Sequence, residues 1–231
     1  MLAVQQLEAG YGESIILRNV SLNVKPGQVV CLLGRNGVGK TTLMKSIMGV
    51  LKARRGVVSY NGADLTKSAP ARRAKSGIGY VPQGREIFGQ LTVYENILIG
   101  LEAAREKVQE VPPEAIAKFP VLPTMYKRRG GDLSGGQQQQ LAFARALASG
   151  PELLLLDEPC EGIQPSIVDD IRDVIRSIKA DGKTAILLVE QSLDFVKSVG
   201  DYFYILDKGA VAWEGELESL SDEVIRRYLT V

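Results

Sequence analysis

The chain has 231 residues, a formal net charge of +1, 45% hydrophobic residues and 24% charged residues. This length and apolar content can bury the core of one full domain, and the near-neutral charge predicts no nucleic acid or other polyelectrolyte as a partner. Apolar runs such as residues 153–156 fall far short of the roughly 20 residues that span a bilayer, and no charged-then-apolar leader opens the chain, so we expect membrane association only through a partner.

The first 83 residues combine short strands with one helix. Apolar alternation and apolar runs predict strands at residues 2–7, 15–24, 29–33, 57–60 and 77–81. Residues 40–48 have helical composition, with Leu43, Met44 and Ile47 on one face. Cys31 lies in an expected strand, and neither it nor Cys160 has CxxC or histidine spacing, so we expect small buried residues rather than a zinc site or a disulfide.

The segment between the strand at 29–33 and the helix at 40–48 matches the phosphate-loop pattern G-x-x-x-x-G-K-[ST]. It consists of Gly34, Arg35, Asn36, Gly37, Val38, Gly39, Lys40, Thr41 and Thr42. Glycines let backbone N–H groups face a phosphate, and the helix N-terminus adds partial positive charge. We expect Lys40 to neutralise the β- and γ-phosphates of ATP and Thr41 to offer its hydroxyl to Mg²⁺. A turn that only caps a helix would not require all of these fixed positions.

Residues 84–149 are expected to be mainly helical. Thr92 and Glu95 form a capping-box pattern at the start of one helix, and four prolines break the stretch that follows, at positions 112, 113, 120 and 123. Ser134 and Gln137 form a second capping box, before a helix that carries Leu141. We expect residues 138–140, all glutamine, to form a solvated helix face, and the basic groups at 54–55, 72–73 and 127–129 to be solvated as well.

An apolar run at residues 153–156 ends in Asp157 and Glu158. A buried strand that runs into an acidic turn is common and proves little by itself. With a phosphate loop upstream, Asp157 is expected on the metal side, through water, and Glu158 is expected to act as the general base on the attacking water.

The last third of the chain resumes an α/β pattern. We expect a helix at 166–179 with an isoleucine-rich stripe, strands at 184–189 and 202–206, a turn at 207–209, a short strand to Trp213 and a last helix at 222–229.

Leu133, Ser134, Gly135, Gly136 and Gln137 spell the signature LSGGQ, and with the phosphate loop and Asp157–Glu158 the chain resembles ABC ATPases over essentially its whole length. The resemblance implies an α/β fold: a P-loop NTPase core of ABC type with an N-terminal antiparallel β region and a small inserted helical lobe. It implies one domain over 1–231, with a core lobe at about 1–83 and 150–231 and a helical lobe at about 84–149. It also implies that the signature faces the nucleotide of a second ATPase subunit, identical or paralogous, in a head-to-tail dimer.

The same resemblance implies that Tyr11 stacks on adenine and that Gln83 connects the γ-phosphate and Mg²⁺ to a transport partner, although an isolated Tyr is more often a packing residue and an isolated Gln a loop residue. The chain departs from the family pattern in two places. It has no histidine, so Gln191 stands at the switch position. Because Gln donates a hydrogen bond but carries no proton, catalysis is expected to rest on Glu158, Gln191 and Lys40. Residues 160–165 replace the family's usual Ser-Ala-Leu-Asp turn, so the contacts of that turn across the dimer are open.

ATP-binding subunits of branched-chain amino acid and urea importers are similar to this chain, and residues 83–88 and 161–166 look most like the urea type. This implies ATP-driven uptake of a small polar solute through two transmembrane permease subunits, served by a solute-binding protein, at the cytoplasmic face of the inner (plasma) membrane. Residues 85–101, with Ile87, Phe88 and Leu91 in an exposed insert, are the expected docking surface; the alternative is that these side chains simply pack the helical lobe. The alternatives are a soluble ABC ATPase of DNA repair or translation, and a P-loop kinase, which would lack the signature.

Overall fold

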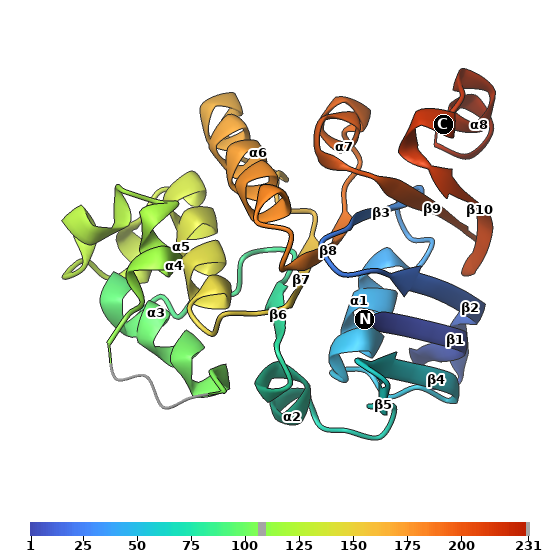
Figure 1. Cartoon of the computed structure of the whole chain (residues 1–231), viewed down its shortest axis with the longest axis horizontal. Helices are drawn as coiled ribbons and strands as arrows, with labels where there is room; N and C mark the ends of the chain where they lie inside the picture. Colours follow the sequence, from blue (N-terminus) through green and yellow to red (C-terminus); the bar gives the residue numbers. More distant parts are fainter. Residues whose placement is uncertain (106–109, 230–231) are drawn as a thin grey trace.

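The computed structural model describes residues 1–105 and 110–229, which form two β-sheets with helices packed around them (Figure 1). The fold class predicted from the resemblance, an α/β P-loop core of ABC type with an N-terminal antiparallel region, is confirmed. Residues 106–109 and 230–231 lie outside the described part of the chain. The first of these ranges belongs to the expected helical lobe, and the second is the end of the expected domain.

A four-stranded antiparallel sheet opens the fold, in the order β2-β1-β4-β5. Its strands are β1 (Leu2–Tyr11), β2 (Ser14–Val24), β4 (Arg55–Tyr60) and β5 (Ala63–Asp64). The three strands expected here are confirmed, whereas the two-residue β5 was not foreseen.

The second sheet has six strands in the order β10-β9-β3-β8-β7-β6. They are β3 (Val29–Leu33), β6 (Ile78–Val81), β7 (Leu153–Asp157), β8 (Ala185–Val189), β9 (Tyr202–Asp207) and β10 (Ala210–Glu216). All neighbours are parallel except β10, which is antiparallel to β9. The strand order makes β3, β8, β7 and β6 consecutive, so the chain segments that follow them share one edge.

Eight α-helices are described, namely α1 (Lys40–Met48), α2 (Pro70–Lys75), α3 (Val93–Gly100), α4 (Pro113–Ala117), α5 (Gly135–Leu147), α6 (Pro165–Ala180), α7 (Leu193–Val199) and α8 (Asp222–Tyr228). Short 3₁₀ helices lie at 101–103, 122–125, 130–132 and 217–219. Both capping boxes are confirmed, at Thr92–Glu95 and Ser134–Gln137. The prolines at 112–113 and 123 do more than break the stretch, because Pro113 and Pro123 sit in the first turns of short helices, where a missing N–H costs nothing.

Strands β3, β7 and β8, at the centre of this sheet, are buried at every residue, and their residues are all apolar except Asp157 at the end of β7. Along β3, Val30 and Leu32 face a core shared with the antiparallel sheet and α1, while Cys31 faces the opposite core, built with α5, α6 and α7. The expected burial of Cys31 is confirmed, and Cys160 is half-buried. None of the helices in the described ranges is long and apolar enough to cross a membrane.

Two expectations of solvated surface were wrong. Gln139 and Gln140 are 4% and 5% exposed, because α5 lies between α3 and the parallel sheet rather than on the surface. Arg73 is 2% exposed and donates to the carbonyl oxygens of Ser46, Ile47, Thr66 and Ser68, so it joins the end of α1 to the loop before α2. The backbone carbonyl oxygens satisfy the Arg73 guanidinium, whereas Gln140 donates to the Asp170 carboxylate.

Candidate functional site

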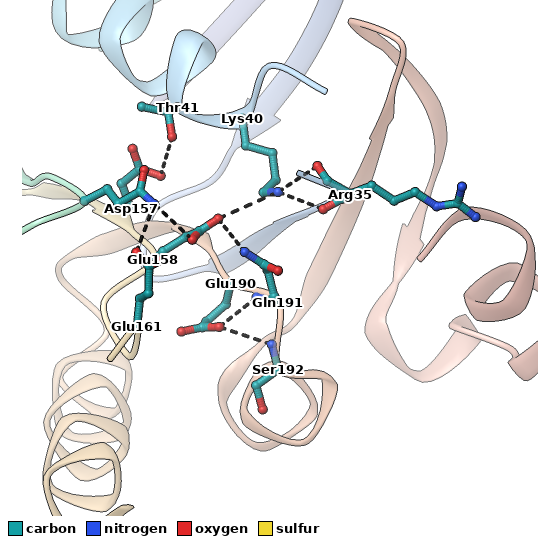
Figure 2. Close-up of polar contacts among 11 residues, drawn as sticks. Arg35, Lys40, Thr41, Asp157, Glu158, Glu161, Glu190, Gln191 and Ser192 are labelled. Carbon is teal, nitrogen blue, oxygen red and sulfur yellow. Dashed lines mark hydrogen bonds and ion pairs between the residues drawn. The ribbon is translucent and has the colours of Figure 1, made fainter. Parts of the chain in front are cut away.

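Four loops meet where neighbouring parallel strands end (Figure 2). The phosphate loop follows β3, Asp157 ends β7 and Glu158 follows it directly, and Gln191 and Gln83 each come two residues after their strands, β8 and β6. Ligands in open α/β sheets bind at the carboxyl ends of strands. The tertiary structure therefore brings Lys40, Glu158 and Gln191 together, although they lie in three separate parts of the chain.

The phosphate loop has the backbone shape that its glycines permit. Gly34 has φ +144°, and a Cβ there would lie 2.4 Å from the carbonyl oxygen of Leu206, so only glycine fits. Gly39 is the N-cap of α1 and has no side chain to cap it. The first N–H groups of the helix are therefore free of a side-chain cap and suit an anion.

Lys40 is 5% exposed and turns back over its own loop. Its ammonium donates to the carbonyl oxygens of Gly34, at 2.7 Å, and Arg35, at 3.0 Å, and lies 3.7 Å from Glu158 Oε1. Burial lowers the pKa of Lys40, while the negative charges of Glu158 and Asp157 oppose that shift. The ammonium is thus held at the centre of the loop, next to the expected base. The Arg35 side chain points away from this group (Figure 2).

Asp157 is fully buried beneath the first turn of α1. Its carboxylate accepts hydrogen bonds from Thr41 Oγ1, at 3.3 Å, and from the Tyr80 hydroxyl, at 3.4 Å. Burial raises the pKa of Asp157 to about 6, although these two hydrogen bonds favour the charged form. No group of three or more His, Cys, Asp or Glu within residues 1–105 and 110–229 could hold a metal by itself. One carboxylate beside one hydroxyl does fit Mg²⁺, which takes its other oxygens from phosphate and water.

Glu158 receives hydrogen bonds on both carboxylate oxygens. Oε1 accepts from Gln191 Nε2, at 2.9 Å, and Oε2 accepts from Gln83 Nε2, at 3.3 Å. The Glu158 backbone has φ +49°, a strained value for a residue with a side chain, and its N–H donates to the carbonyl of Val189. Strain at such a position marks a residue whose direction is held by its surroundings. The structure therefore joins three predicted residues, Gln83, Glu158 and Gln191, in one network.

Tyr11 ends β1 and is 50% exposed. None of the hydrogen bonds around Glu158 reaches it. A half-exposed aromatic ring is available for stacking, but its contact with adenine stays a prediction.

The signature residues lie at the start of α5, apart from the phosphate loop. In Figure 1, α5 stands with α3 and α4 on one side of β6 and β7, whereas α1 lies on the other side, against the antiparallel sheet. Ser134 accepts a hydrogen bond from the Gln137 N–H, at 3.3 Å, as the N-cap of α5. A Cβ on Gly136 would lie 2.8 Å from Ile167 of α6, so this glycine also permits close helix packing. A single chain does not place Ser134 against its own phosphate loop.

The expected docking segment borders an apolar cavity of about 620 Å³ between α2, β6, α3 and α5. Phe88 is 48% exposed there, as expected, but Ile87 and Leu91 are half-buried, and Ile87 packs on the core below. Arg145 of α5 stacks over the Phe88 ring at 5.4 Å and donates to the carbonyl oxygens of Glu86 and Arg85. Both of those residues have positive φ, at +44° and +71°, so Arg145 stabilises a strained turn beside the cavity.

Sequence reasoning missed three residues of the site. Tyr80 donates to Asp157, Glu161 accepts a hydrogen bond from Gln83 at 2.9 Å, and Glu190 accepts backbone N–H groups beside Gln191. Glu190 had a usable signal, since it is an acidic residue directly after an apolar strand, in the same relation to β8 as Glu158 to β7.

Comparisons with known proteins agree with this geometry. The family described as ABC transporter matches residues 17–161. The probable branched-chain amino acid transport ATP-binding protein LivF of Archaeoglobus fulgidus is 39% identical, over 95% of this chain and 94% of that protein. The high-affinity branched-chain amino acid transport ATP-binding protein BraG of Pseudomonas aeruginosa is 37% identical, over 91% of each chain.

Solved structures share the fold over almost the full length. The dimeric structure of a bacterial ABC transporter cassette superposes with a TM-score of 0.84 at 27% identity, covering 94% of this chain and 99% of that one. A dimeric cassette in a post-hydrolysis state, bound to ADP and Pi, superposes with a TM-score of 0.83 at 27% identity and the same coverage.

Proposed function

Because this chain belongs to the ABC transporter family of ATP-binding proteins and is an ATPase, we propose that it powers the uptake of a small polar solute through a membrane permease. The observation that carries the proposal is the meeting of Lys40, Asp157, Glu158 and Gln191 at the ends of β3, β7 and β8 (Figure 2). The transport names of its relatives weigh against the alternative of a soluble ATPase in DNA repair or translation.

The phosphate loop binds the β- and γ-phosphates of ATP in this proposal. Lys40 exchanges the carbonyl oxygens of Gly34 and Arg35 for phosphate oxygens, which are stronger acceptors for an ammonium. The N–H groups of residues 34–42 complete the phosphate cradle, and the exposed ring of Tyr11 stacks on adenine. Thr41, Asp157 and Gln83 hold Mg²⁺, which when bound neutralises charge on the phosphates.

Glu158 accepts the proton of the attacking water while the bond from the γ-phosphorus to the ADP oxygen breaks. Gln191 donates its amide hydrogen to a γ-phosphate oxygen and orients the water, and it does not move a proton. Both groups already face each other at 2.9 Å, and Lys40 is 3.7 Å from the same Glu158 oxygen. When the Lys40 ammonium turns to the phosphates, its ion pair with Glu158 breaks, and the Glu158 carboxylate becomes available as a base.

The signature residues Leu133–Gln137 complete the site of a second subunit. They lie in a different part of the chain from the phosphate loop, so a two-fold head-to-tail dimer with an identical or paralogous ATPase brings them against the γ-phosphate. Dimeric cassettes among the similar solved structures support this arrangement.

The permease docks at the apolar cavity beside Phe88, which follows Gln83 by five residues. In this proposal the chain lies at the cytoplasmic face of the inner membrane, bound to two permease subunits, and a solute-binding protein delivers the solute to them. The relatives' names favour a branched-chain amino acid as the solute, whereas the motifs at residues 83–88 and 161–166 favour urea.

Sizing of Glu158→Gln protein with saturating MgATP tests the shared site. Loss of the proton acceptor leaves ATP bound, so we expect this variant to elute as a dimer, and Lys40→Ala, the matched control, to stay monomeric. A Glu158→Gln chain that stays monomeric with MgATP contradicts the homodimer and points to a paralogous partner. Release of free phosphate by the parent chain without an acceptor separates the ATPase from a P-loop kinase.

A further inference from the structure

Glu190 is a buried carboxylate in the loop that carries Gln191. It is 5% exposed, and it takes no part in the side-chain contacts between Lys40, Glu158 and Gln191. A buried carboxylate destabilises a fold unless hydrogen-bond donors satisfy it. The hydrogen-bond donors around Glu190 therefore indicate which parts of the chain this carboxylate holds together.

Both carboxylate oxygens of Glu190 accept main-chain N–H groups, and they do so from two different loops. Oε2 accepts from Gln191, at 2.7 Å, and from Ser192, at 3.1 Å, as Figure 2 shows. Oε1 accepts from the N–H of Cys160, at 3.2 Å. Burial and the Glu190 charge raise the pKa of the Cys160 thiol, which therefore stays protonated beside this carboxylate. One side chain thus joins the loop after β8 to the turn after β7.

These two loops carry the base and the switch residue. Cys160 is two residues after Glu158, whose φ of +49° is strained, and the N–H of Glu161 closes the turn on the Glu158 carbonyl. The direct contact between the Glu158 and Gln191 side chains is one hydrogen bond. Three main-chain hydrogen bonds to Glu190 constrain the backbones from which both side chains extend.

We propose that Glu190 is a positioning residue that fixes Gln191 and the Glu158 turn relative to each other, so that both side chains meet the γ-phosphate as one unit. This inference rests on the roles proposed above for Glu158 and Gln191. Misplacement of such a pair by about 1 Å costs on the order of 10²-fold in rate, so a bridge between the two loops affects turnover more than nucleotide binding.

Glu190→Gln tests the bridge with almost no change of size. A glutamine side chain has only one acceptor oxygen, so it can accept N–H groups from only one of the two loops. Its NH₂ group then faces an N–H of the other loop, and two donors cannot form a hydrogen bond. We expect kcat for ATP hydrolysis to fall about 10- to 100-fold, with ATP affinity changed less than about threefold. Adding Gln191→Ala to this variant should cost little more, because Gln191 is already misplaced. The proposal would be overturned by parental turnover of Glu190→Gln. It would also be overturned if the fold-loss of kcat in the double variant equalled the product of the two single losses.

Hydrogen exchange on the same proteins shows the bridge independently of activity. Glu190→Gln should raise exchange in both loops, residues 158–161 and 190–192. Glu152→Gln is the matched control, since Glu152 lies at the opposite end of β7, where it is bound by Arg105, Tyr60 and Asn61. It should change neither turnover nor exchange in these loops.

Two further outcomes are decisive. If Glu190→Gln does not fold, Glu190→Asp carries the test, because its carboxylate is drawn back by about one C–C bond and no longer spans the two loops; a folded Glu190→Asp with parental kcat overturns the proposal. If the parent chain releases no phosphate from MgATP, it is the proposed function that fails. In that case unchanged exchange in residues 158–161 of Glu190→Gln overturns the bridge itself, and raised exchange in both loops supports it.

Discussion

Asp157→Asn should make the chain more stable and less active at the same time. Burial raises the pKa of Asp157 from 3.8 to about 6, so the folded protein holds a proton at this carboxyl more tightly than the unfolded chain does. Ionised Asp157 therefore destabilises the fold. The stability that the neutral carboxyl contributes is fully present below about pH 4, and it is lost as the pH rises through about 6. Asparagine keeps the shape, and the Thr41 and Tyr80 hydroxyls can still pair with it.

The magnitude follows from the shift of the pKa. About two units at 1.36 kcal/mol per unit give a gain of roughly 3 kcal/mol above pH 7 as the upper limit. For a chain of this size that is an increase of about 6–12 °C in Tm. The gain should disappear below about pH 4, where aspartate is neutral in both the folded and the unfolded chain.

Urea unfolding of parent and variant in metal-free buffer, at pH 7.5 and at pH 4, measures this. Glu152→Gln is the control of opposite sign, because the hydrogen bond from Arg105 lowers the pKa of Glu152, so its removal should bring no gain at pH 7.5. With ATP present, added Mg²⁺ should stabilise the parent further and Asp157→Asn hardly at all. A variant no more stable than the parent at pH 7.5 would refute the argument that burial dominates at Asp157.

Five other substitutions, at four residues, separate the roles of the remaining side chains. Lys40→Ala should weaken ATP binding as well as hydrolysis, whereas Glu158→Gln should keep binding and lose on the order of 10²-fold in turnover; near-parental phosphate release by Glu158→Gln would assign the base elsewhere. Gln191→Ala should lose roughly 10- to 10²-fold in kcat, whereas Gln191→His, which keeps a donor, should retain most activity; parental turnover of Gln191→Ala in a phosphate-release assay would make Gln191 a bystander. Arg73→Met should lower the free energy of unfolding by at least about 3 kcal/mol, because it leaves four carbonyl oxygens without their donor, and a loss under about 1 kcal/mol in urea unfolding would contradict that role.

The sequence alone determined the parallel core of this protein, because its signals are local. Strands β3 and β8 are unbroken apolar runs, and β7 is one up to Asp157 at its end. The helix that follows Ser134 has its whole capping box within four residues. Continuous apolar runs indicate strands buried on both faces, whereas alternating apolar residues indicate strands buried on one face. The phosphate loop could be named for the same reason, because its spacing is a local pattern that fits phosphate binding. Asp157–Glu158 could be interpreted only with that loop upstream, and the role of the signature came from the resemblance to ABC ATPases. The roles of these residues in catalysis stay predictions.

Only the tertiary structure decided which polar residues leave the surface. Gln139, Gln140 and Arg73 looked solvated because side-chain polarity is local information, whereas the carbonyl oxygens that satisfy Arg73 come from two separate segments of the chain, the end of α1 and the loop before α2. The bridge through Glu190 has the same origin. Its three main-chain donors lie on loops that are 30 residues apart, from Cys160 to Glu190, and that become neighbours only because β7 and β8 pair in parallel. A carboxylate is buried or exposed according to the donors that the fold brings to it, and no local pattern contains that information.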